Sequence, residues 1–246
     1  MLISSIAARE IRSLYATPVA WVLLAASQLL LAWLMFAQLE VYLEIQPKLT
    51  AGGSHLGIIQ LVVMPTLNTS ALMLLVIIPL LGARSFSGEM QSGRINLLLS
   101  SPVSPLQLVL GKWLGLVLAA APVTVLAIMM ALTIELASSL DTGQLLSSAL
   151  GLLLVTGMAT ALTLWLSSIT RQVMVAASLA YGILFLLWLL NSHSTEGALG
   201  SLALSPNLQP FLQGVLQFSH LMYFISITLL GLGLATHRLW RLGGGK

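Results

Sequence analysis

The chain has 246 residues, of which 58% are hydrophobic and only 7% are charged. A soluble domain carries about 25% charged residues, so this composition leaves too little polar surface to cover a water-soluble core. It therefore excludes a soluble globular protein and predicts an all-α polytopic membrane protein, because the apolar runs are long enough for helices rather than barrel strands. Cysteine is absent, which excludes disulfides and cysteine metal sites.

The first segment, residues 2–16, has the pattern of an amphipathic helix that lies in the membrane interface. Apolar residues share one face, and Arg9 and Arg12 lie on the other. Glu10 falls within the apolar face. Its carboxylate either extends to water or pairs with a basic residue of the polar loop around residues 84–104. We favour the ion pair, because an isolated charge there would be costly.

Six apolar segments are long enough to cross the membrane: 19–39, 58–81, 106–134, 145–166, 173–190 and 215–234. The third is longer than needed, so its first turns, with Lys112, are expected to protrude into water. It begins at Ser104-Pro105-Leu106-Gln107, where Ser104 can cap the helix and Gln107 can complete a capping box. Residues 191–213 are too short to cross and are expected to form an outer loop with short re-entrant helices.

Three polar residues of the second span, Asn68, Thr69 and Ser70, have two interpretations. A polar group in hydrocarbon must face another helix or a cavity. Contact between helices is the favoured interpretation, and lining of a substrate pathway is the alternative.

The charges are distributed asymmetrically along the chain. With the N-terminus inside, the inner segments hold nine of the basic residues and two of the acidic ones, and the outer segments hold one basic and five acidic residues. This pattern predicts that both termini are cytoplasmic. It also explains the isoelectric point of about 9.6 without nucleic acid as a partner.

No catalytic or nucleotide-binding motif is present. Gly111-Lys112 fails as a phosphate loop, because Leu106 stands where glycine is required and Trp113 replaces serine or threonine. No metal site is predicted. The spans contain almost no acidic or basic residues, which argues against a proton- or sodium-coupled carrier. We therefore expect no enzyme activity and no bound cofactor in this chain. Energy for transport would come from another subunit, and the loop at residues 84–104 is the natural docking element.

The sequence around this loop resembles the cytoplasmic loop of ABC transporter permeases of the type-2 exporter class. The residues that carry the resemblance are Arg84, Glu89, Ser92, Gly93, Ile95, Leu98, Leu99, Pro102, Val103, Ser104, Gly111 and Lys112. Arg9-Glu10-Ile11-Arg12, followed by Thr17-Pro18, is similar to the entry helix of that family. The segment from Leu204 to Phe224 looks closest to the gliding-motility branch. Arg94-Ile95-Asn96 departs from the family, which often has Thr-x-Glu there.

The resemblance implies a six-span permease that forms a homodimer in the bacterial inner membrane. It implies export driven by a cytoplasmic ATP-binding subunit that holds ATP and magnesium, with a further membrane or periplasmic subunit as an option. Residues 2–16, with Arg9, Glu10 and Arg12, would be a connecting helix. Part of residues 84–101 would be a coupling helix that contacts the ATPase through Arg84, Phe86, Glu89, Met90 and Arg94. Phe86 and Met90 lie four residues apart, so both are expected to fill one apolar groove of the partner.

Two other functions stay open from the sequence. The chain could be a structural or regulatory membrane subunit that transports nothing itself. It could also be a stand-alone carrier or channel, although the scarcity of charge within its spans argues against this.

Overall fold

The computed structural model describes residues 2–51, 57–95, 103–135, 142–190 and 202–243, and the regular elements in these ranges are helices. In chain order they are α1 (Leu2–Tyr15), α2 (Pro18–Ala51), the π-helical turn η1 (Ile59–Val63), α3 (Met64–Gly82), α4 (Arg84–Gln91), α6 (Pro105–Glu135), α7 (Thr142–Ser167), α8 (Val173–Leu189), α9 (Leu204–Leu212) and α10 (Phe218–Gly243). The predicted all-α class is therefore confirmed for the described residues.

Five helical segments are long and apolar enough to cross a membrane: Pro18–Pro47, Ile59–Gln91, Pro105–Ile134, Thr142–Ser167 and Phe218–Gly243. They correspond to five of the six expected spans. The remaining one, 173–190, is the apolar helix α8, which has 17 residues. At 1.5 Å per residue, α8 is about 26 Å long, slightly less than a bilayer core of about 30 Å.

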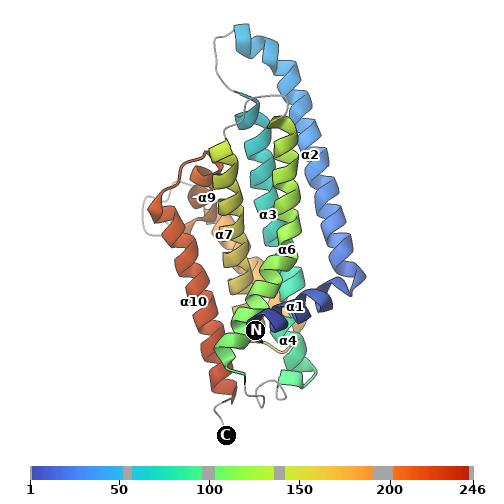
Figure 1. The fold of residues 1–246 in the computed structure, drawn as a ribbon, viewed down its shortest axis with the longest axis vertical. Helices are drawn as coiled ribbons and strands as arrows, with labels where there is room; N and C mark the ends of the chain where they lie inside the picture. The colour runs from blue at the N-terminus through green and yellow to red at the C-terminus, as the bar shows by residue number, and fades with distance from the viewer. Residues whose placement is uncertain (1, 52–56, 96–102, 136–141, 191–201, 244–246) are drawn as a thin grey trace.

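The long helices form one bundle, with α3, α6 and α7 between α2 on one side and α10 on the other (Figure 1). Helix α2 has 34 residues and extends well beyond its neighbours at the upper end of the bundle. Helix α1 lies across the lower end of the bundle, beside α4 and the start of α6, and the last turns of α10 reach the same end. We call this the α1 end of the molecule.

Small residues on α7 let neighbouring helices approach closely. A Cβ added at Gly151 would lie 2.7 Å from the Cβ of Phe211 on α9, and one added to Gly231 of α10 would lie 3.0 Å from the backbone of Ala161. Close approach of this kind stabilises helix pairs in membranes, where lipid supplies no hydrophobic driving force between them. Helix α7 is accordingly the most buried of the five candidate spans.

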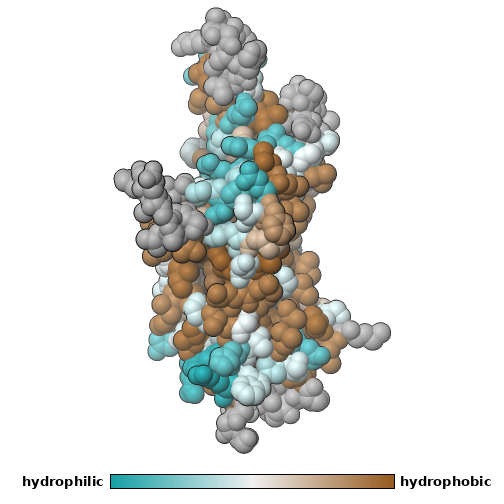
Figure 2. Space-filling model, turned by 90° about the vertical axis from the view of Figure 1, so that its left-hand side faces the viewer, coloured by the Kyte–Doolittle hydropathy of each residue, from teal (hydrophilic) through white to brown (hydrophobic). Residues whose placement is uncertain are grey.

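The outer surface is apolar around the middle of the bundle and polar toward both ends. Figure 2 shows this band from the left-hand side of Figure 1. On other faces large side chains such as Leu29, Trp33 and Phe36 of α2 are more than 60% exposed. A soluble protein would bury such residues, whereas lipid solvates them.

Two local predictions can be checked at the ends of spans. The capping box at the start of α6 is confirmed, since Ser104 Oγ accepts a hydrogen bond from the Gln107 amide and Gln107 Oε1 accepts one from the Ser104 amide, both at 3.3 Å. Within the expected outer loop 191–213, α9 forms a short helix that packs on α7 through Leu208 and Phe211. Residues 191–201 of that loop lie outside the described residues.

Candidate functional site

The expected coupling segment is helical from Arg84 to Gln91 and follows α3 almost without interruption. It ends in a turn at Gly93, whose φ of 72° is one that glycine adopts without strain. Residues 96–102 of the expected loop lie outside the described residues. The helix α4 therefore begins directly at the end of a membrane span, so its position is set by the bundle.

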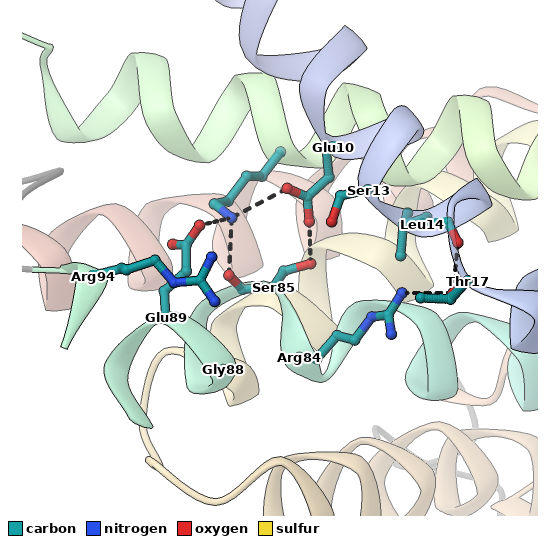
Figure 3. A pocket seen from close by; sticks show the side chains of 10 residues that line it. Glu10, Ser13, Leu14, Thr17, Arg84, Ser85, Gly88, Glu89 and Arg94 are labelled. Atoms are coloured by element: carbon teal, nitrogen blue, oxygen red, sulfur yellow. Dashed lines mark hydrogen bonds and ion pairs between the residues drawn. The ribbon is translucent and has the colours of Figure 1, made fainter. Parts of the chain in front are cut away.

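The centre of the site is the ammonium group of Lys112, on the second turn of α6. Its Nζ lies 2.8 Å from Glu89 Oε1, 3.2 Å from Glu10 Oε2 and 2.9 Å from the carbonyl oxygen of Ser85 (Figure 3). Ser85 Oγ in turn donates to Glu10 Oε1 at 2.7 Å. The three N–H donors of the lysine therefore have three acceptors, and these come from α1 and α4. We call Glu10, Ser85, Glu89 and Lys112 the charged junction.

The junction is shielded from water, which strengthens its electrostatic interactions. The Lys112 side chain is 1% exposed, and those of Glu10 and Glu89 are 11% and 18% exposed. The aromatic ring of Phe86 lies below the ammonium, with 5.1 Å between Nζ and the ring centroid. This contact favours the cation. Opposite charges that share a low-dielectric site attract strongly, but each also needs its partners to offset the cost of leaving water.

Two glycines of α6 bring α1 close enough for Glu10 to reach Lys112. A Cβ added at Gly111 would lie 2.7 Å from the Cβ of Ile6, and one added at Gly115 would lie 2.8 Å from the Cβ of Glu10 and 3.0 Å from the carbonyl oxygen of Ala7. The backbone of α1 thus rests directly on the α6 face that contains these glycines.

A hydrogen bond fixes the other end of α1 to the same helix. Tyr15 Oη donates to the carbonyl oxygen of Ala119 at 2.8 Å. Burial raises the pKa of Tyr15, so the phenol keeps its proton and this bond at neutral pH.

We expect Tyr15→Phe to cost about 1 kcal/mol of stability, measured as a lower melting temperature in detergent. Tyr42→Phe is the control, because no hydrogen bond of the Tyr42 hydroxyl is found among the described residues; an equal loss there would contradict the assignment.

Helix α4 is also attached to α7, through a serine at the end of that span. Ser167 Oγ accepts hydrogen bonds from the amides of Phe86 and Ser87, both at 3.0 Å, and donates to the carbonyl oxygen of Ala83 at 2.6 Å. Amides in the first turn of a helix have no partner within it, so this hydroxyl acts as a cap supplied by another helix. Ser167 is a site residue that the sequence did not predict.

The structure corrects two expectations about the charged residues. Lys112 does not protrude into water but is buried. Glu10 forms the predicted ion pair, yet its partner is Lys112 of α6 and not a basic residue of the 84–104 loop. The sequence contains an indication of this burial. Lys112 is the one basic residue of its span, and the glycines one position before it and three after it allow another helix to pack closely.

The expectation that Phe86 contacts a partner is also wrong. Phe86 is fully buried within the chain, against the expectation that it fills a groove of a partner. The helical period that places it four residues before Met90 also turns it toward the interior, where Ser167 anchors its backbone. Met90 is partly buried, and Arg94 is exposed with its Nε donating to Ser92 Oγ at 3.1 Å.

The remaining basic residues of the site differ in exposure. Arg9 and Arg12 are exposed on the outer face of α1. Arg84 is half-buried, and its Nη2 donates to Thr17 Oγ1 at 3.1 Å. The structure therefore brings Glu10, Arg84 and Glu89 together at one place and leaves Arg9 and Arg12 outside it.

The three polar residues of the second span have different surroundings. The hydroxyls of Thr69 and Ser70 donate to carbonyl oxygens of their own helix, and Ser70 is fully buried. Asn68 instead faces a hollow of about 300 Å³ lined by Gln60, Met64, Pro65, Asn68, Gln209, Leu212 and Gln213. Its Oδ1 is buried without a hydrogen-bond donor among the described residues. Of the three, only Asn68 lines this hollow.

The comparison with known families agrees with this architecture. The sequence profile of the ABC-2 family transporter protein matches residues 4–236, which is most of the chain. The chain belongs to the ABC-2 transporter family. A search of curated proteins found no match. ABC-2 proteins are multi-pass membrane components of transporters, generally non-catalytic, and they normally work with an ATP-binding subunit. In this ABC-2 permease, the charged junction joins α4, the expected coupling helix, to α1, the expected connecting helix.

Proposed function

We propose that this ABC-2 permease is the membrane subunit of an ATP-driven exporter and receives the movement of a separate ATP-binding subunit through α4. The observation that carries the proposal is the attachment of α4 on two sides. Lys112 ties it to α1 and α6, and Ser167 ties it to α7. A short helix held in this way converts displacement by a partner into movement of several spans.

The contact with the ATP-binding subunit is proposed at the exposed end of α4. Gln91 and Ser92 are exposed there, and Met90 borders them. Glu89 and Phe86 do not form part of this contact. They contact the Lys112 ammonium and so fix the orientation of α4. Arg84 lies at the opposite end of α4. This division of roles replaces the groove contact first expected for Phe86.

The wider assembly follows the family pattern. The permease would form a homodimer in the bacterial inner membrane, with both termini in the cytoplasm and with ATP and magnesium held by the partner. A further membrane or periplasmic subunit is an option. The hollow at Asn68 is the proposed polar part of the substrate pathway, because its unpartnered oxygen can accept a hydrogen bond from cargo.

The test is purification of the tagged permease from its native host in mild detergent, followed by identification of stoichiometric partners. We expect an ATP-binding subunit, and we expect a Gln91→Glu/Ser92→Glu variant to reduce its recovery at least about tenfold, since an unpaired charge buried at an interface is costly. The melting temperature of the permease alone should not change, because both side chains are exposed.

Arg241→Glu is the matched control, because Arg241 is exposed at the same end of the bundle but on α10. Equal loss of the ATPase in this control would show a general charge effect and contradict docking by α4. A permease that purifies alone, stable and without any ATPase, would favour the structural or regulatory alternative.

A further inference from the structure

A second feature of the α1 end is a polar hollow of about 250 Å³ between α1 and α4. The charged side chains of its lining are Arg84, Arg94, Lys112, Glu10 and Glu89. Figure 3 shows Arg84 and Arg94 on either side of Ser85. The lining contains three cations and two carboxylates, so its formal charge is positive by one.

The two arginines of this hollow have no acidic partner within the described part of the chain. Its two ion pairs both involve Lys112, with Glu10 and with Glu89. Glu40 and Glu44 lie far along α2, and Glu135 ends α6, at the opposite end of the bundle. Arg84 is half-buried beside Thr17 and therefore has limited access to water. A partly buried guanidinium without a counter-ion favours binding of an anion.

Aromatic residues indicate where the hollow lies relative to the membrane. Tyr15 and Trp21 are in contact, with 5.2 Å between ring centroids, and Trp21 Nε1 donates to the carbonyl oxygen of Tyr15 at 2.9 Å. Trp21 is 60% exposed. Tyrosine and tryptophan gather at the level of lipid headgroups. Thr17, which bonds Arg84, lies between these two aromatics in the chain, so the hollow is at headgroup depth.

We propose that this hollow binds the phosphate of an anionic phospholipid from the leaflet at the α1 end. The Arg84 and Arg94 guanidinium groups would donate to the phosphate oxygens, and Ser13 and Thr17 offer hydroxyls beside them. A headgroup with a single negative charge would neutralise the lining. A lipid is favoured over a carboxylate of the ATP-binding subunit, because Arg84 lies at the end of α4 away from the exposed Gln91 and Ser92. The proposal requires neither ATP hydrolysis nor transport.

Native mass spectrometry of the purified, delipidated permease, without any ATPase, tests this site. The protein is titrated with phosphatidylglycerol, with phosphatidylcholine and with inorganic phosphate. We expect phosphatidylglycerol to bind at least about fivefold more tightly than phosphatidylcholine. Each of Arg84→Gln and Arg94→Gln should weaken its binding about fivefold, and the double variant about 25-fold, because one basic residue near a headgroup contributes about this factor.

The control is Arg171→Gln, which removes the same charge from an exposed turn between α7 and α8 that does not line the hollow. Binding in this control should be unchanged. Arg84→Lys, which keeps the charge, should retain most of the binding, and a melting curve identifies any variant that fails to fold.

Three results would overturn the proposal. They are equal binding of the two lipids, equal loss in Arg171→Gln, or competition by inorganic phosphate at concentrations comparable to the lipid, which would indicate a site for free phosphate. Undiminished lipid binding in Arg84→Gln together with loss of the ATP-binding subunit would assign this arginine to the partner instead.

Discussion

Replacing Lys112 by methionine is expected to lower the stability of the permease by about 3 kcal/mol, because it leaves Glu10 and Glu89 as partly buried carboxylates without a cation. For a chain of this size that corresponds to a decrease in melting temperature of roughly 6 to 12 °C. The measurement is thermal unfolding in detergent at low and high salt. Salt should change the result little, since the Lys112 side chain is 1% exposed and its pairs are shielded.

A neutralised junction separates the role of charge from that of packing. Adding Glu10→Gln and Glu89→Gln to Lys112→Met removes all three charges while keeping the shapes similar. We expect this triple variant to recover most of the stability, because apolar or neutral groups of similar volume often replace a buried ion pair without loss. Recovery of stability without recovery of ATP-driven transport would show that the junction serves coupling. An unchanged melting temperature in Lys112→Met alone would contradict the geometry described here.

Replacing Gly115 by alanine is expected to separate α1 from α6. The new methyl would lie 2.8 Å from the Cβ of Glu10 and 3.0 Å from the carbonyl oxygen of Ala7, and a backbone atom cannot move aside as the end of a side chain can. Overpacking of this kind costs about 1–3 kcal/mol. Trypsin provides the readout, because Arg9 and Arg12 on α1 should be cleaved faster once the helix detaches.

The matched control is Gly182→Ala in the middle of α8, where an added Cβ meets no atom within 4 Å. This change should be neutral or slightly stabilising, since alanine is the better helix former. Cleavage at Arg9 and Arg12 that stays at the wild-type rate in Gly115→Ala would contradict the close packing of α1 on α6.

The five long apolar helices could be predicted because they depend on local composition. A run of about 20 apolar residues crosses a bilayer whatever surrounds it, and Ser104-Pro105-Leu106-Gln107 starts a helix through contacts within one turn. The helix at residues 84–91 was instead implied by the family resemblance. The cytoplasmic location of both termini stays a prediction, which rests on a charge bias summed over the chain.

The partners of individual side chains could not be predicted in this way. Lys112, the single lysine of the third span, was expected to protrude into water. The sequence does not show that α1 crosses α6 at Gly111 and Gly115 and shields this lysine from water. Phe86 and Met90 shared one helical face in the sequence, but only the contact with Ser167 decides that Phe86 points inward.

Composition and hydrophobic period thus determined by themselves that this protein is helical and has long apolar segments that can cross a membrane, whereas a helix within the 84–104 loop was implied by the family resemblance. Tertiary structure alone decided that Glu10, Glu89 and Lys112 meet, since their three helices are brought together by close backbone packing. The physical reason is that membrane insertion depends on the summed transfer free energy of a segment, whereas an ion pair depends on distances of a few ångströms between residues 23 and 102 positions apart.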